Sequence, residues 1–396
     1  MARLWGSGIE LNATGSGVEF TVASNFTIDT TTVRSGTYSY RSNPSASADN
    51  FQYDFATSDQ TKSLYFRFYM RVASAPLSVA DIFTVYNTAN AAKVSLRLNT
   101  DLTLDVFNNE DAAIVGTGHA ALSTNTWYRV ELKVDTTTIS TTAVEGKVDG
   151  TSFGSGTINL ATGIAKSFLG SNVAVETFDI YFDDIAYNDN SGSFQNSWPG
   201  EGEIIHLRPD SAGDNEAWND GTGTTFAEVD EVTPDDGTTH IEENTANAIT
   251  DFNLDATPAA LASDDTINVV QVGVRFASEG GSSSNSTFAL RIKASAGGTV
   301  EEGSTITPAS TNYSTNAPAA PRNYNLTLYD LPGESTTAWT KADLDTAQIG
   351  VKLVANDFWE ARVSTLWLLV DHKPAEAPAG YGDVFISNRD LLGVGV

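Results

Sequence analysis

Cysteine is absent from this chain of 396 residues, and histidine occurs only four times, at His119, His206, His240 and His372. The lack of cysteine excludes disulfides, thiolate metal sites and a cysteine nucleophile. No run of about 18 apolar residues occurs, so the sequence predicts no membrane-spanning helix. The first residues also lack the basic segment and apolar run of a secretory signal. We therefore expect a protein that is made in a cytoplasm.

Basic residues are scarce as well: 22 Lys+Arg stand against 50 Asp+Glu, which gives a formal net charge of −28. A surface this negative repels phosphate backbones and anionic lipids, so we expect neither nucleic acid nor membrane as a partner. Hydrophobic residues make up 40% of the chain, a globular composition. At about 150 residues per domain, the length predicts two or three domains.

Alternation of apolar and polar residues dominates the chain and predicts strands at 64–72, 93–98, 102–107 and 127–135. In the last of these, Tyr128 and Val130 share the apolar face, whereas Trp127 falls on the polar face with Arg129. Asp149-Gly150 is a two-residue hairpin signal. Short strands between turn residues predict an all-β fold of two antiparallel β-sandwich (jelly-roll) domains with a short C-terminal extension.

A polar segment at 188–193 has the composition of a linker and divides the chain. We expect a first domain at 1–190, a second β-sandwich at 198–373 and a C-terminal docking tail at 374–396. Thr340 to Asp343 resembles a capping box and predicts a short helix. The tail has no core of its own, so we expect it to dock on a partner through its apolar residues Val384, Phe385, Ile386, Leu391 and Leu392.

Three segments of the first domain resemble the concanavalin A-like (laminin-G-type) jelly-roll modules. They are Val33–Arg41, Thr126–Leu132 and Phe178–Ile185, which are similar to an early, a central and the closing strand of such modules. The segment from Asn196 onward, with Trp218 and the strand around Trp367, resembles the second domain of virion proteins from tailed bacteriophages.

This resemblance implies a non-enzymatic virion structural protein on the capsid or tail surface, as a decoration or tail-attached protein. Its expected partners are other virion proteins, copies of itself in the assembled particle, and a host surface glycan. Its expected location is the virion surface. The alternative is a carbohydrate-binding adhesion protein, and a further alternative is a glycan hydrolase.

Catalysis by paired carboxylates needs a separation of about 5–9.5 Å. Asp179 and Asp183 share one face of the closing strand, but at about 3.3 Å per residue they lie roughly 13 Å apart. No Gly-x-Ser-x-Gly elbow occurs. We therefore predict no catalytic residue.

Asp183 and Asp184 are adjacent, so one of them must face inward or lie on a bulge. The resemblance implies that Asp184 and Glu10 match acids that hold a structural ion, here Ca²⁺; otherwise no cofactor is expected, and these acids cap loop amides. Trp5, Trp198 and Trp218 lie near turn residues and are the candidates for stacking on a glycan. For Trp198 the alternative is a plug between the domains.

Overall fold

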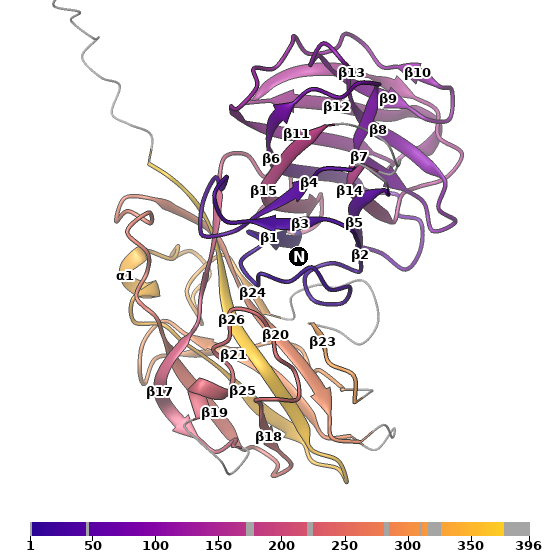
Figure 1. The fold of residues 1–396 in the computed structure, drawn as a ribbon. Coiled ribbons are helices and arrows are strands. Elements are labelled where there is room, and N and C mark those ends of the chain that lie inside the picture. The colour runs from indigo at the N-terminus through magenta and orange to yellow at the C-terminus, as the bar shows by residue number, and fades with distance from the viewer. Residues whose placement is uncertain are drawn as a thin grey trace, which may run out of the picture.

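The computed structural model describes residues 2–44, 47–171, 178–219, 225–280, 285–308, 311–315 and 326–375. Two β-sandwiches follow one another along the chain, the first drawn from indigo to magenta and the second from pink to yellow (Figure 1). The predicted all-β fold with antiparallel sheets is confirmed. No helix among these residues is long and apolar enough to cross a membrane.

The first sandwich pairs an eight-stranded sheet with a seven-stranded sheet. The eight-stranded sheet runs in the order β13 (Thr151–Ile158), β12 (Thr142–Val148), β11 (Trp127–Asp135), β6 (Ser63–Ser74), β15 (Asp179–Asp189), β4 (Ser39–Ser42) and β3 (Thr27–Asp29), and β1 (Arg3–Ser7) also pairs with β15. The seven-stranded sheet runs in the order β10 (Ala113–Ile114), β9 (Leu104–Asn108), β8 (Ala92–Leu98), β7 (Ala80–Tyr86), β14 (Lys166–Ser171), β5 (Asp49–Asp54) and β2 (Val22–Ser24). A 3₁₀ turn, η1 (Ile139–Thr141), precedes β12.

Apolar side chains at alternate positions determine which face of each strand is buried, because only one face of each sheet meets the core. In β6, Phe66 and Phe68 are fully buried in the core, and in β11 so are Val130 and Leu132. The predicted hairpin is also present: Asp149 and Gly150 join β12 to β13 with positive φ angles of 49° and 83°, as a type I′ turn requires.

The second sandwich pairs a six-stranded with a five-stranded sheet. The six-stranded sheet contains β16 (Glu203–Leu207), β26 (Ala361–Lys373), β20 (Thr266–Ser278) and β23 (Ser314–Thr315), with β18 (Ile241–Glu243) beside β26 and β24 (Leu326–Leu328) beside β20. The five-stranded sheet runs β17 (Pro209–Glu216), β19 (Ile249–Leu254), β25 (Gln348–Ala355), β21 (Thr287–Lys293) and β22 (Val300–Glu302). This sandwich also contains a short 3₁₀ helix, η2 (Thr225–Glu228), and a short α-helix, α1 (Lys341–Leu344). Helix α1 begins with the predicted capping box of Thr340 and Asp343.

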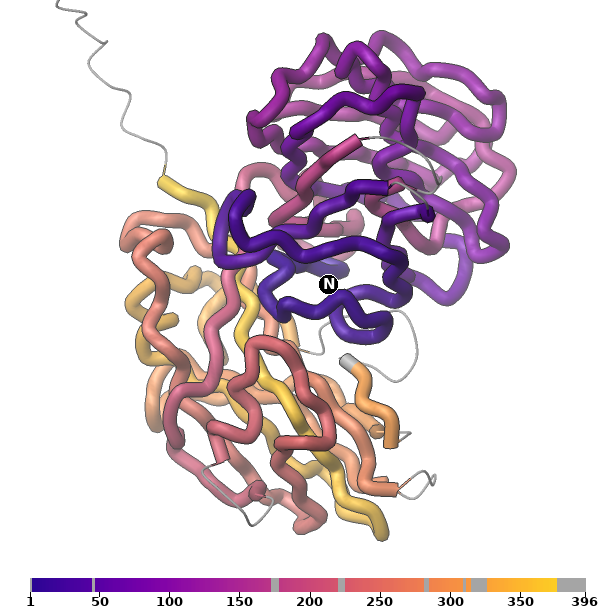
Figure 2. The backbone as a smooth tube through the Cα atoms, in the orientation of Figure 1, coloured from indigo at the N-terminus to yellow at the C-terminus, as the bar shows by residue number. Residues whose placement is uncertain are grey.

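The two sandwiches share a buried seam. Trp367 and Leu369 of β26 pack in the core cluster of the first sandwich, together with Ile204 of β16. The N-terminal strand lies on the side of the first sandwich that faces the second (Figure 2). At this seam the Arg3 guanidinium lies 2.6 Å from the Asp371 carboxylate, and the Arg67 guanidinium lies 3.3 Å from it, all with fully buried side chains. We call these three residues the Asp371 centre.

Candidate functional site

Two of the three tryptophans predicted to stack on a glycan are core residues. Trp5 is 3% exposed and stacks on Tyr53 with ring centroids 4.3 Å apart. Trp218 is fully buried, and its indole N–H donates to the backbone carbonyl of Ala248. The prediction that they present rings to a glycan is therefore wrong for this conformation, because turn residues nearby in sequence do not exclude burial by distant strands.

Trp198 is half-buried on the outward face of the eight-stranded sheet. The Lys147 ammonium lies 3.9 Å from the centre of its ring, and Tyr65 packs edge-on at 5.6 Å. Two residues further on, the backbone N–H of Gly200 donates to Glu131 over 2.8 Å. One ring face of Trp198 is thus occupied by a cation, and the residue fastens the interdomain segment to the sheet.

Asp184 and Glu10, the two residues predicted to hold Ca²⁺, lie close to each other beside the seam between the sandwiches. As predicted, the Asp183–Asp184 pair lies at a bulge in β15, where Asp184 takes a φ of 48°. The Asp184 carboxylate pairs with the Arg34 guanidinium and accepts from the Ile204 N–H over 2.7 Å. Glu10 accepts from the backbone N–H groups of Thr37 and Tyr38 over 3.0 and 3.2 Å.

This donor set does not fit a metal ion. Arg34 already supplies the positive charge beside Asp184. Among the residues that the structure describes, no group of three or more histidine or acidic side chains could hold a metal. The carboxylates of Asp184 and Glu10 cap backbone amides, which is the alternative drawn from the sequence.

Burial changes the protonation of three acids at this centre. Burial raises the pKa of Glu10 to about 7, against the lowering effect of the Thr37 and Tyr38 amides. Burial likewise raises the pKa of Glu19 to about 7, although the Ser7 hydroxyl donates to it. Burial and the neighbouring charge of Asp184 raise the pKa of Asp183 well above its ordinary value. We call Glu10, Glu19 and Asp183 the Glu19 centre.

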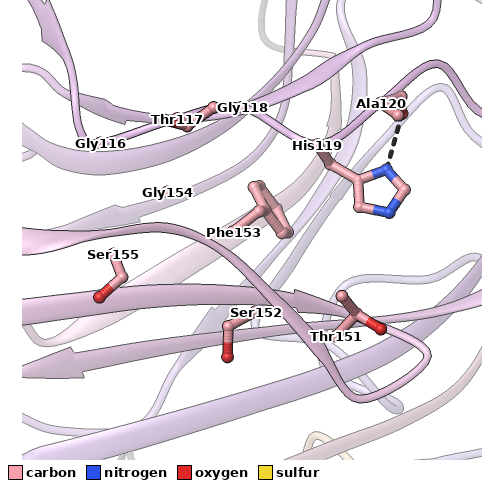
Figure 3. A pocket seen from close by; sticks show the side chains of 10 residues that line it. All are labelled: Gly116, Thr117, Gly118, His119, Ala120, Thr151, Ser152, Phe153, Gly154 and Ser155. Carbon is pink, nitrogen blue, oxygen red and sulfur yellow. Dashed lines mark hydrogen bonds between the residues drawn. The ribbon is translucent and has the colours of Figure 1, made fainter.

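A pocket of about 560 Å³ opens elsewhere, at an edge of the first sandwich (Figure 3). Its two walls are the loop 116–120, which follows edge strand β10, and the segment 151–155 of edge strand β13. The Gly154 N–H donates to the Thr117 carbonyl over 2.7 Å and ties the walls together. A Cβ on Gly118 would lie 2.1 Å from the Asp105 carboxylate, so close packing requires glycine here. We call this cavity the edge pocket.

The lining of the edge pocket is neutral and rich in hydroxyl groups. Thr117, Thr151 and Ser155 contribute hydroxyls, whereas the Ser152 hydroxyl donates to the Glu145 carboxylate of the neighbouring strand β12, and no aspartate, glutamate, lysine or arginine is among the lining residues. Its one ring pair is His119 and Phe153, with centroids 5.7 Å apart at 72° (Figure 3); Phe153 is buried in the core of the sandwich, and His119 is half-exposed. The volume lies within the range of about 300–1,000 Å³ of small-molecule sites.

His119 has a defined hydrogen-bond role at this pocket. Its Nδ1 lies 2.7 Å from the Ala120 carbonyl oxygen. Because a carbonyl only accepts, Nδ1 must carry the proton, which leaves Nε2 of the neutral ring as an acceptor. The pocket thus offers an acceptor nitrogen, hydroxyls that both donate and accept, and an aromatic ring.

A row of side chains crosses the outward face of the seven-stranded sheet and ends beside this pocket. Paired positions in successive strands place Gln52, Phe168, Thr84, Ser95, Phe107 and Ile114 in one line. The Thr84 and Ser95 hydroxyls are 2.9 Å apart, and both residues are buried. Phe107 and Phe168 are half-exposed. Ile114 lies two residues before the edge-pocket loop.

Sequence reasoning missed the edge pocket. In the sequence His119 stands out only as one of four histidines, and nothing near it predicts a pocket. Each wall carries a Gly-x-Gly pattern, Gly116-Thr-Gly118 and Gly154-Ser-Gly156, which is the one local signal of close backbone approach. Their meeting depends on which edge strands face each other, and that is a long-range property.

Comparison with known proteins finds similar solved structures. No protein-family model matches the chain, and no curated protein matches it. A carbohydrate esterase from the Shiga toxin-encoding bacteriophage phi24B is 13% identical, with 48% of this chain and 100% of that chain covered at a TM-score of 0.36. An endo-β-1,4-glucuronan lyase from the fungus Trichoderma reesei is 11% identical, with 42% and 87% covered at 0.32. An alginate lyase is 13% identical, with 46% and 95% covered at 0.33.

These neighbours correct one prediction. Most of them, a Trypanosoma rangeli sialidase included, are enzymes that act on carbohydrates, so the prediction that this chain is not an enzyme is withdrawn. The neighbours are carbohydrate-processing β-sandwich proteins, and one of them comes from a phage. At 10–13% identity they identify no activity or substrate for this chain.

Proposed function

We propose that this protein binds a carbohydrate, and that the edge pocket holds a neutral sugar ring. The observation that carries the proposal is the lining: the hydroxyls of Thr117, Thr151 and Ser155 and the half-exposed His119 ring line a pocket whose lining residues include no carboxylate, ammonium or guanidinium group. A sugar presents hydroxyls around its rim and C–H groups on its faces. The hydroxyls match the polar lining, and the C–H face matches the half-exposed imidazole ring of His119.

The test begins with an array of neutral and acidic oligosaccharides, followed by calorimetry on the glycans that bind. Ser155→Trp places a large ring in the pocket from an exposed position, and we expect a loss of affinity of about tenfold or more. Thr157→Trp is the matched control, because Thr157 is exposed on the same strand β13 but does not line the pocket.

His119→Ala removes the acceptor nitrogen, and we expect a smaller loss, of about five- to tenfold. Silence of the array, or equal binding by Ser155→Trp and the wild type, would refute the site. Mass spectrometry of each bound glycan after incubation then reports whether the protein also cleaves or deacylates it.

A place on a phage particle is a separate proposal. It rests on the likeness of the first 190 and following residues to virion modules described above, with other virion proteins and copies of the chain as partners. The five apolar tail residues Val384, Phe385, Ile386, Leu391 and Leu392, predicted to serve assembly, lie outside the described residues. Mass spectrometry of purified particles tests this proposal.

A further inference from the structure

A second line of side chains crosses the outward face of the eight-stranded sheet. Register places Trp127 of β11 opposite Arg71 of β6, Arg71 opposite Tyr181 of β15, and Tyr181 opposite Arg41 of β4. Adjacent strands lie about 4.8 Å apart, so the four residues span roughly 14 Å. These strands lie next to one another in the first sandwich (Figure 1). We call the four residues the arginine row.

The neighbours of each strand position show that the arginine row faces outward. Met70 and Val72 flank Arg71, Ile180 and Phe182 flank Tyr181, and all four flanking residues are buried in the core. Alternation along a strand therefore directs Arg71 and Tyr181 away from that core. In β11 the polar side of the strand is likewise the outward face, and Trp127 lies on it, opposite Arg71.

The two arginines of the row differ in their partners. Arg41 is neutralised by Asp179, to which its Nε and an Nη donate over 2.8 and 2.7 Å. Arg71 is half-exposed, and within the described part of the chain no carboxylate lies within ion-pair distance of it. Both guanidinium groups flank the Tyr181 ring, at 5.6 Å for Arg41 and 5.8 Å for Arg71.

The chain has 50 acidic and 22 basic residues, and most arginines in its described part form an ion pair with an acid. A guanidinium offers a planar fork of donors that fits a carboxylate with two parallel hydrogen bonds. The remaining positive charge at Arg71 therefore favours an anionic ligand on a molecule whose surface otherwise repels anions.

The rings beside Arg71 decide between classes of anion. Trp127 is half-exposed directly opposite Arg71, and Tyr181 lies on the other side of it. A flat indole ring packs well on the C–H face of a sugar, and Trp127 lies at the strand position directly opposite the carboxylate-binding Arg71. A flexible acidic peptide would use the charge but not the ring.

We propose that the arginine row is a second carbohydrate site, specific for a carboxylate-bearing sugar of an acidic glycan. Arg71 binds the carboxylate, Trp127 packs on the sugar ring, and the Arg41–Asp179 pair fixes Tyr181 beside them. This site lies on the opposite sheet from the row that ends at the edge pocket, and it does not depend on that pocket for its ligand.

The test is calorimetry with an oligoglucuronate, a neutral gluco-oligosaccharide of the same length, and a poly-glutamate peptide of similar charge. We expect the oligoglucuronate to bind, the neutral oligosaccharide to bind at least about tenfold more weakly, and the peptide likewise. Arg71→Gln should weaken oligoglucuronate binding about tenfold or more, and Arg71→Lys about two- to fivefold, because lysine keeps the charge but loses the fork.

Trp127→Ala keeps every charge and should still weaken the sugar about fivefold, which a purely electrostatic site would not show. Arg362→Gln is the matched control, since Arg362 is a partly exposed arginine in the second sandwich. Thermal unfolding of each variant verifies folding. Absence of oligoglucuronate binding, an unchanged affinity in Arg71→Gln, or equal binding of poly-glutamate would overturn the proposal.

Discussion

The Asp371 centre joins the first sandwich to the second, and the Glu19 centre lies beside that seam. A buried carboxyl group has a lowered pKa in the first centre and a raised pKa in the second. Burial alone would raise the pKa of Asp371, but the charges of Arg67 and Arg3 outweigh it and hold that pKa below its ordinary value. At the Glu19 centre burial prevails, and the pKa of Glu19 rises to about 7. The comparison teaches that the number of adjacent cations, and not depth, decides whether a buried acid stays charged.

The largest effect is expected from removing the charge of Asp371. Asp371→Asn leaves the buried guanidinium groups of Arg3 and Arg67 without a counter-charge, and we expect a loss of about 3–5 kcal/mol in the free energy of unfolding. Urea unfolding followed by tryptophan fluorescence measures it. The triple variant Arg3→Met, Arg67→Met, Asp371→Leu removes all three charges together and should recover part of the loss. A loss below about 1 kcal/mol in Asp371→Asn would contradict this account.

A smaller, pH-dependent effect is expected at Glu19. The folded protein holds the Glu19 proton up to about pH 7, whereas the unfolded chain releases it near the ordinary value of 4.5. The protonated folded state is therefore favoured at low pH, and this part of the stability is lost as the pH rises from about 4.5 to about 7. Glu19→Gln keeps the group neutral, so the fall in unfolding free energy across this window should shrink by about 1–3 kcal/mol.

The matched control for Glu19 is Glu201→Gln, because Glu201 is exposed. Its pH profile should follow that of the wild type. Parallel profiles for Glu19→Gln and the wild type would show that Glu19 is ionised in the folded protein, and the contrast between the two centres would then disappear.

The smallest effect is expected from an uncharged contact at the same seam. The Tyr329 hydroxyl accepts from the backbone N–H of Arg3 over 3.0 Å, and its ring stacks on Phe194 at 5.1 Å. Tyr329→Phe keeps the ring and removes the hydroxyl, which should cost about 0.5–1.5 kcal/mol. The loss should be the same at about pH 5 and about pH 8. A strong pH dependence of this loss would mean that the ionic centres and the neutral contacts act as one unit.

Local patterns in the sequence predicted strands, one hairpin turn and the start of one helix. Alternation placed β6 and β11, the Asp149-Gly150 pair placed a hairpin, and Thr340 placed a helix start. Each of these depends on residues within a few positions of one another. Trp5 was misjudged because its burial depends on Tyr53, almost fifty residues away.

The candidate sites depend on even longer-range pairing. Trp127 and Arg71 meet only because β11 pairs with β6 in one particular register. A shift of one residue would turn Arg71 into the core. The walls of the edge pocket likewise come from the edges of two different sheets. Hydrophobic alternation determines which face of a strand is buried, but it does not determine which strands are neighbours.

The separation of Arg3 and Asp371 along the chain has a consequence for synthesis. They lie 368 residues apart, and Arg67 and Asp371 lie 304 apart. At about 5–20 residues per second, a ribosome takes roughly 15–60 s to add Asp371 after Arg67. The first sandwich can fold only once its strand β15 has been added, and from then until Asp371 follows, its two guanidinium groups and the surface that receives Trp367 still face water. The nascent first sandwich thus exposes two arginines for a time, and β26, the last strand of the second sandwich, covers them when Asp371 pairs with both.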